Sequence, residues 1–143
     1  MLKNIPPILG PDLLYVLRAM GHGDEIAIVD ANFPGDSSGP QLIRLDGLSA
    51  SEVLDAVLTL MPLDTFVDQQ AIGMEVVGDP AKREDTHRDF DRIVKQHEPA
   101  MQLTLLERFA FYDRVEGAYA IVQTGERRLY GNILLKKGII RPH

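Results

Sequence analysis

The sequence predicts an α/β layered fold. Short apolar runs typical of buried strands alternate with amphipathic helical stretches through the first half of the chain, which favours helices layered on a sheet. The length of 143 residues suits one domain with a substantial hydrophobic core. No internal repeat, low-complexity segment or linker divides the chain. We therefore expect residues 1–143 to form a single domain.

The first helix and the first strand meet at a histidine that lies between two glycines. Pro11 suits the first position of a helix, apolar residues follow at helical spacing, and Gly21 suits the position just past its end. The run 25–29, EIAIV, is typical of a buried strand. His22 occupies the turn between them, and Asp30 directly follows the strand. Open α/β sheets bind ligands where strands end, so this stretch is the leading candidate for a site.

The remaining elements follow from capping signals and apolar spacing. Ser49 and Glu52 form a capping box that starts a helix, and Pro62 stops it. A further entry signal, Asp79-Pro80, predicts a mostly polar surface helix that continues to about His97. Strands are also expected at 41–45, within 65–77, and at 101–106, 119–122 and 133–135, with a short helix at 107–114.

Composition and charge exclude several classes of function. The formal net charge is −6 and there is no tryptophan, so neither a basic surface nor aromatic platforms for nucleic acid are expected. The chain has no cysteine, which removes disulfides, thiolate nucleophiles and cysteine-type zinc sites. No apolar run reaches the roughly 18 residues of a membrane span, and the N-terminus lacks a signal-peptide pattern. We expect a cytoplasmic protein that binds neither nucleic acid nor membranes.

The candidate site residues are polar groups beside turns and strand ends. A histidine takes up and releases protons near neutral pH, so His22 is either an acid/base or a capping or core residue. Asp30 either caps the next turn or accepts a hydrogen bond from a substrate hydroxyl. Tyr130-Gly131-Asn132 offers a phenol, a close backbone approach and an amide, or is only a turn before the last strand. Arg108 either clamps an oxygen-rich ligand or pairs with surface acids.

No metal and no cofactor are expected. The histidines have no metal-binding spacing on one helix face, and His87 and His97 are assigned to a solvated helix. No dinucleotide-binding, Walker or nucleophile-elbow motif is present. A five-residue strand spans about 17 Å at ~3.3 Å per residue. His22 and Asp30 therefore meet only if a loop folds back or a neighbouring subunit supplies one of them.

Several motifs, in their order along the chain, resemble the ribose pyranase / L-fucose mutarotase family, and more closely its fucose branch. The matching pieces are Met1-Leu2-Lys3 with Pro6 to Leu17, Met20-Gly21-His22-Gly23-Asp24-Glu25-Ile26, Asp30-Ala31 with Phe33-Pro34, Gly39-Pro40-Gln41, Arg108-Phe109-Ala110-Phe111-Tyr112, Thr124-Gly125-Glu126, and Tyr130-Gly131-Asn132-Ile133-Leu134-Leu135-Lys136-Lys137-Gly138. Two departures are Asn32 and Asp36, which stand where the fucose branch often has histidine. The stretch 64–100 shows little that matches.

The resemblance implies a three-layer α/β/α domain with a central mixed sheet, which assembles into ring-based homo-oligomers, typically decamers. It implies an isomerase that interconverts the anomers of a free monosaccharide, most closely L-fucose, without a cofactor. The catalytic acid/base maps onto His22. The implied substrate-binding positions are Asp30, Arg108, Tyr130, Gly131 and Asn132.

Two roles stay open within this implied site. Tyr130 acts through its phenol or only through its backbone, and Asp30 holds a hydroxyl or exchanges protons with His22. Two other functions also stay open. A ribose pyranase would change ring size as well as anomer, and a sugar-binding accessory protein would need the same hydroxyl partners without turnover.

Overall fold

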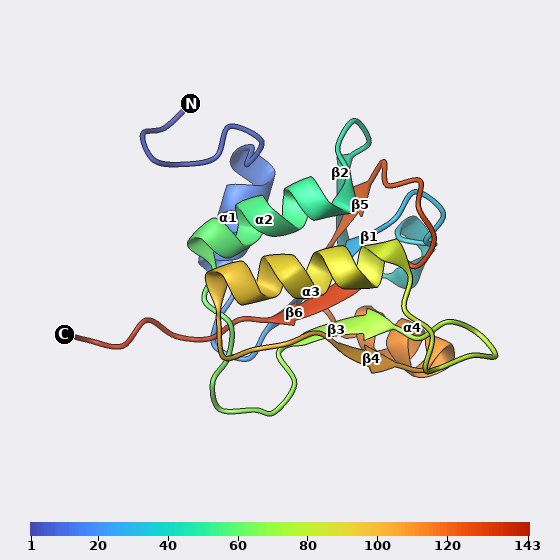
Figure 1. The fold of residues 1–143 in the computed structure, drawn as a ribbon. Coiled ribbons are helices and arrows are strands. Elements are labelled where there is room, and N and C mark those ends of the chain that lie inside the picture. Colours follow the sequence, from blue (N-terminus) through green and yellow to red (C-terminus); the bar gives the residue numbers. More distant parts are fainter.

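A six-stranded mixed sheet forms the middle layer of the computed structural model, which describes residues 1–143, and four α-helices cover it (Figure 1). The elements in chain order are α1 (Pro11–Ala19), β1 (Glu25–Val29), the 3-10 helix η1 (Asp36–Ser38), β2 (Gln41–Leu45), α2 (Ala50–Leu60), β3 (Ala71–Met74), α3 (Asp85–His97), β4 (Thr104–Leu106), α4 (Arg108–Glu116), β5 (Ala120–Thr124) and β6 (Ile133–Lys136). None of the helices has the length and apolar character needed to cross a membrane.

The direction of the strands decides which chain segments meet at each edge of the sheet. The strand order is β2-β5-β1-β6-β3-β4. The strands β1, β2 and β5 are parallel, β3 and β4 are parallel, and β6 runs antiparallel to both β1 and β3. Every strand except β6 therefore points the same way. The carboxyl ends of those strands and the amino end of β6 share one edge, and the start of β1 lies at the opposite edge.

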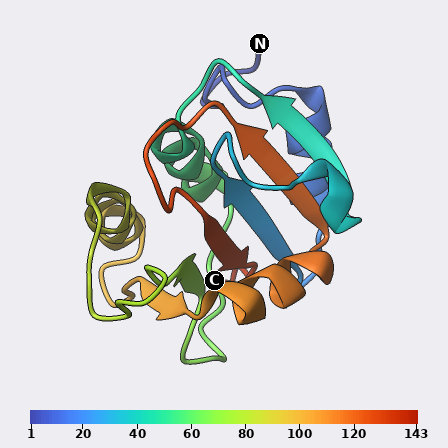
Figure 2. The ribbon, with the colours of Figure 1, turned by 90° about the vertical axis from the view of Figure 1, so that its right-hand side faces the viewer.

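Alternating side chains of the strands build a core on each face of the sheet. In β1, Ile26 and Ile28 join the larger core, whereas Ala27 and Val29 join the smaller one, as the two-residue period of a strand requires. Figure 2 shows α2 and α3 on one side of the sheet and α4 on the other. The three-layer α/β/α class with a central mixed sheet is thus confirmed.

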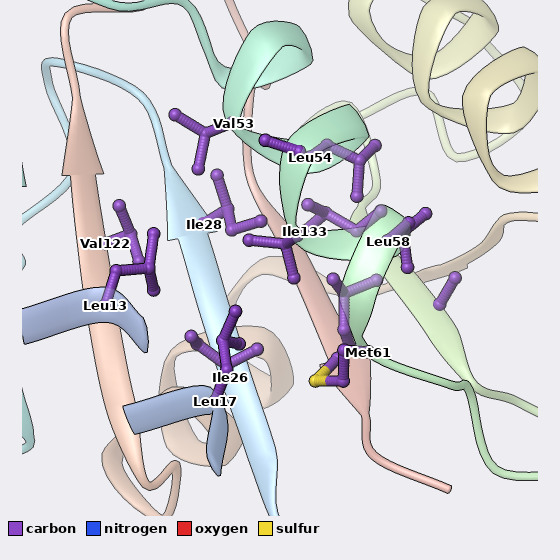
Figure 3. Packing of buried hydrophobic residues seen from close by; sticks show 14 of the residues in the cluster. Leu13, Leu17, Ile26, Ile28, Val53, Leu54, Leu58, Met61, Val122 and Ile133 are labelled. Atoms are coloured by element: carbon purple, nitrogen blue, oxygen red, sulfur yellow. The ribbon is translucent and has the colours of Figure 1, made fainter. Parts of the chain in front are cut away.

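The larger core is formed by α1, α2 and α3 against the sheet. Figure 3 shows side chains of α1 and α2 pointing at Ile26, Ile28, Val122 and Ile133. The helix α2 begins with the expected capping box, in which Ser49 Oγ accepts from the Glu52 N–H at 3.1 Å and Glu52 accepts from the Ser49 N–H at 2.8 Å. The smaller core includes Phe33 and Phe111, whose ring centroids lie 6.1 Å apart.

Two expectations about α3 are wrong. The helix begins at Asp85 and not at Asp79-Pro80, because Asp79 donates its N–H to the Val76 carbonyl in a turn that contains Gly78 at a φ of +79°. The assignment of His87 to a solvated face is also wrong, since His87 is only 1% exposed. Both of its ring nitrogens form hydrogen bonds with backbone groups. A polar side chain can be buried when its hydrogen-bonding atoms have partners in this way.

Candidate functional site

The strand directions gather most of the expected site residues at one edge of the sheet. Asp30 follows β1, Arg108 follows β4, and Tyr130, Gly131 and Asn132 precede the antiparallel strand β6. This is the edge at which open α/β sheets bind ligands. We call these residues the binding edge.

Asp30 is the centre of the binding edge and is 6% exposed. Its carboxylate accepts hydrogen bonds from the N–H groups of Asn32 at 3.0 Å and Gly131 at 3.2 Å, and its own N–H donates to Asn132 Oδ1 at 2.9 Å. Burial raises the pKa of Asp30 above its usual value, although these hydrogen bonds oppose the rise. Asp30 therefore caps its turn and also holds the Gly131-Asn132 backbone in place.

Asn132 binds Asp30 through its side-chain amide and retains donor capacity for a ligand. Its Oδ1 accepts from the Asp30 N–H, which fixes the orientation of the amide. The Asn132 side chain also hydrogen-bonds the Asp30 carboxylate, which opposes the rise in the pKa of Asp30 that burial causes. An NH2 group carries two protons, so one of them can still be donated to a hydroxyl that enters the edge.

Gly131 is required by close packing. A Cβ at this position would lie 2.7 Å from Glu126 Cγ and 3.2 Å from Asp30 Cβ. Tyr130, just before it, has a φ of +57°, a left-handed conformation that is uncommon for a residue with a side chain. The Tyr130 hydroxyl accepts from the Val77 N–H at 3.0 Å.

Arg108 lines a pocket of about 180 Å³ beside Tyr130. Glu75, Val77 and Glu107 also line it. The Arg108 guanidinium lies 4.4 Å from the centroid of the Phe109 ring, and its Nε is buried without a hydrogen-bond partner. A buried donor without a partner is costly, and an oxygen atom of a bound ligand would satisfy it.

Tyr112 is a residue at this edge to which the sequence assigned no role. It lies one helical turn after Arg108 on α4, and its ring centroid is 5.3 Å from that of Phe33. Phe33 belongs to the loop that Asp30 begins. The Arg108-to-Tyr112 motif therefore brings a second phenol toward the binding edge. Helical spacing would have predicted this position for Tyr112 only if Arg108 were already known to lie at that edge.

His22 lies at the opposite edge, where it forms a pair with an unexpected partner. His22 Nε2 is 2.9 Å from Asp64 Oδ1, and the two side chains are 43% and 4% exposed. The Phe66 N–H donates to the same oxygen at 3.0 Å, and the Phe66 ring lies 5.2 Å from the imidazole. We call His22, Asp64 and Phe66 the histidine edge.

The charge of Asp64 fixes the direction of this hydrogen bond. Burial works against the carboxylate, but the hydrogen bonds from Phe66 and His22 outweigh it and hold the pKa of Asp64 below its usual value. An ionised carboxylate only accepts, so His22 donates from Nε2 and its Nδ1 is left without a partner in the chain. No sequence signal links the two residues, since 42 positions separate them.

One chain does not bring the two edges together. Asp30, Gly131 and Asn132 are in direct contact, and the Tyr130 hydroxyl binds Val77, which lines the same pocket as Arg108. His22 is separated from them by the length of β1, about 17 Å at ~3.3 Å per residue. No loop folds back across that distance.

A small pocket bordered by hydrogen-bonding groups at the strand ends defines an α/β protein that binds a small polar molecule. The sequence profile of the RbsD / FucU transport protein family matches residues 3–140. The chain therefore belongs to the RbsD / FucU family, which confirms the resemblance noted in its motifs.

Fucose mutarotases are among the proteins that this chain resembles. Human fucose mutarotase is 44% identical over 145 residues, which cover 97% of this chain and 94% of the human protein. The crystal structure of the fucose mutarotase from Streptococcus pneumoniae, in complex with L-fucose, matches with a TM-score of 0.90 and 44% identity over 98% of this chain and 100% of that one. RbsD from Bacillus subtilis, complexed with D-ribose, matches with a TM-score of 0.73 and 20% identity over 99% and 100%, a likeness of fold.

Proposed function

We propose that this protein is an isomerase that interconverts the α and β anomers of a free monosaccharide, with L-fucose as the first candidate, and needs no cofactor. The observation that carries the proposal is the 44% identity, over nearly the whole of both chains, to a fucose mutarotase solved with L-fucose. The polar groups of the two edges support it, because the reaction needs an acid/base and hydrogen-bond partners for the sugar hydroxyls, and these groups can provide both.

Anomers exchange through the open aldehyde form. A base removes the proton of the anomeric hydroxyl, an acid protonates the ring oxygen, and the bond between C1 and the ring oxygen breaks. Rotation about C1–C2 and closure on the other carbonyl face give the second anomer. Each positioned proton donor or acceptor contributes typically about 10²–10⁴-fold to such a step.

His22 is the proposed acid/base. Asp64 holds the Nε2 proton, so the free Nδ1 lone pair is available to accept the proton of the anomeric hydroxyl. The imidazolium that forms is then stabilised by a buried carboxylate 2.9 Å away. Protonation of the ring oxygen by the same imidazolium completes ring opening.

The binding edge supplies hydroxyl partners in this proposal. Arg108 has a buried Nε without a partner, and the Asn132 NH2 group has a second proton beside the one it shares with Asp30, so both can donate to sugar oxygens. Asp30 retains acceptor capacity beside its two backbone bonds. Tyr130 and Gly131 adjoin these groups, since the Gly131 N–H binds Asp30 and the Tyr130 phenol binds the Val77 N–H.

A second copy of the chain is proposed to complete each site, because the two edges are separate within one chain. Exposed apolar side chains accompany both edges. Phe66 is 61% exposed beside His22, and Val77, Phe109 and Leu129 are 51%, 61% and 64% exposed beside the binding edge. Such a surface favours association. Light scattering should give a mass well above 15.9 kDa, and a monomer at working concentration would contradict the proposal. A ring-based decamer and a cytoplasmic location stay predictions.

NMR magnetisation transfer between the anomeric protons of L-fucose and of D-ribose tests the function. We expect the protein to accelerate α/β exchange of L-fucose beyond the rate in buffer. Exchange between the pyranose and furanose forms of D-ribose without an effect on fucose would favour a ribose pyranase. Binding of either sugar without accelerated exchange would favour an accessory sugar-binding protein.

A further inference from the structure

A side chain in the first turn of α3 is hydrogen-bonded to the segment that precedes β6. Both elements are labelled in Figure 1. Thr86, which is 1% exposed, points its hydroxyl at two consecutive carbonyl oxygens, those of Leu129 at 2.8 Å and Tyr130 at 3.2 Å. A hydroxyl has one proton, so the two carbonyls share it. Thr86 is too buried to meet a ligand itself.

Tyr130 is held on three sides. Thr86 binds its carbonyl, the Val77 N–H binds its hydroxyl at 3.0 Å, and the ring of His87 lies 6.1 Å from its own ring. These contacts maintain the φ of +57°, which this residue would otherwise rarely adopt. The backbone conformation of Tyr130 in turn sets where the next two residues point.

His87 is a rigid support for this arrangement. Its Nδ1 accepts from the Glu84 N–H at 3.0 Å, so the other nitrogen carries the proton and donates to the Met74 carbonyl at 2.8 Å. The ring thus ties α3 to the end of β3. The turn of α3 that carries Thr86 is thereby fixed to the sheet.

We propose that Thr86 is a positioning residue for the sugar site, an inference that rests on the proposed function. Its hydroxyl orders the Leu129 and Tyr130 carbonyls, and this places the Gly131 N–H and the Asn132 amide on Asp30. Loss of the hydroxyl frees the segment to leave its left-handed conformation. Sugar binding then weakens, while proton transfer at the histidine edge is unaffected.

Thr86→Val tests the proposal, since it keeps the shape of the side chain and removes only the hydroxyl. Thr86→Ser restores the hydroxyl. Thr104→Val is the matched control, because the Thr104 hydroxyl also faces a backbone carbonyl, that of Ala71 at 3.4 Å, at the start of β4 and away from the binding edge. Thermal unfolding establishes that each variant is folded.

We expect Thr86→Val to raise the L-fucose concentration for half-maximal exchange about three- to tenfold, with a limiting rate within about twofold of the parent. Thr86→Ser and Thr104→Val should both resemble the parent. A parental half-saturating concentration in Thr86→Val, a collapsed limiting rate, or failure of Thr86→Ser to restore binding would overturn the proposal. If Thr86→Val does not fold, Thr86→Ala carries the same comparison.

A second readout does not depend on catalysis. The Gly131 N–H is hydrogen-bonded to Asp30, so its amide hydrogen exchange reports whether the segment is ordered. Faster exchange at Gly131 in Thr86→Val than in Thr104→Val supports the positioning role, and equal exchange contradicts it. If the parent protein exchanges no sugar anomers, the proposed function fails while this measurement still decides the role of Thr86.

Discussion

The two polar edges of the sheet differ in how firmly the chain holds their side chains. At the binding edge, Asp30 and Asn132 are 6% and 4% exposed and bind each other and the Gly131 backbone. At the histidine edge, His22 has one hydrogen-bond partner and 43% of its side chain exposed. A group that recognises hydroxyls benefits from fixed geometry, whereas an acid/base must reach the reacting atoms of a ligand held elsewhere. Under the proposed function, recognition and proton transfer would therefore fall to separate elements.

The largest effect is expected from His22→Ala, which removes the proposed acid/base and leaves the binding edge intact. Because His22 is partly exposed, the fold should persist. We expect the enzyme-dependent rate of anomer exchange to fall about 10²-fold or more, with sugar binding retained. NMR exchange and calorimetric titration with L-fucose measure the two quantities.

His97→Ala is the matched control for that variant. His97 also pairs with an aspartate, Asp55, with its Nε2 2.7 Å from the carboxylate, but it joins α2 to α3 away from both edges. Its loss should leave the exchange rate unchanged. A parental rate in His22→Ala would remove His22 from the mechanism, and with it the division between the two edges.

Gly131→Ala is expected to disturb the binding edge next most strongly. The added Cβ would meet Glu126 Cγ at 2.7 Å, so the backbone or Glu126 must move, at a cost of about 1–3 kcal/mol of unfolding free energy. The half-saturating sugar concentration should rise by about tenfold or more, since Asp30 and Asn132 move with the segment. Gly47→Ala is the control, because nothing lies within 4 Å of its Cβ. Equal behaviour of the two variants would show that the close packing at Gly131 is unimportant.

Local signals allowed part of this arrangement to be predicted from the sequence. The end of α1, the glycine-flanked turn and the strand β1 follow from neighbouring residues, so His22 and Asp30 could be placed at opposite ends of one strand. The contact between Asp30 and Asn132 joins residues 102 positions apart, and it depends on the pairing of β1 with β6, which no local pattern encodes. Local chemistry singled out Asp30 and residues 130–132 separately, and only the family resemblance placed them in one site.

Buried polar residues explain most of the errors. The sequence from 85 to 97 is mostly polar, so it predicted a solvated helix face for His87. Thr86 and His87 are nevertheless buried, because the partners that satisfy them are backbone groups from other elements, which leave no trace in side-chain pattern. Asp64 was not predicted either, because its role depends on hydrogen bonds with His22 and with the Phe66 N–H, which no sequence pattern indicates.

Asp30→Asn should weaken sugar binding by a smaller factor than Gly131→Ala, about tenfold. The side-chain amide offers one acceptor oxygen in place of two, so its NH2 group must face the N–H of Asn32 or Gly131. Asn132→Ala, which removes a neutral donor, should raise the half-saturating concentration only several-fold. Exchange rates measured against sugar concentration report both. A collapsed limiting rate in Asp30→Asn, with unchanged binding, would instead make Asp30 a proton-transfer partner.

The smallest expected effect is a dependence of the unfolding free energy on pH. It arises from His87, which packs against Tyr130 at the binding edge. Burial holds the pKa of His87 below its usual 6.5, although the hydrogen bond to the Met74 carbonyl opposes this shift. The charges of Arg83 and Arg88 lower the pKa further, and that of Glu84 raises it. The unfolded chain therefore binds a proton at His87 at a higher pH than the folded protein does. The unfolding free energy should fall as the pH drops below about 6.5, and this contribution should level off below the pKa of the folded state.

His87→Gln isolates that contribution, since glutamine keeps a donor and an acceptor but does not titrate. The variant should be less stable than the parent near neutral pH, because its amide does not reproduce the bonds to Glu84 and Met74. Its unfolding free energy should nevertheless decline less steeply between about pH 6.5 and 5, as measured by urea denaturation. Acidic groups such as Asp30 titrate in both proteins and cancel in the difference. If the unfolding free energies of the parent and the variant fell equally steeply with pH, the fold would not hold His87 neutral. The contact of His87 with Tyr130 would then be insensitive to acid.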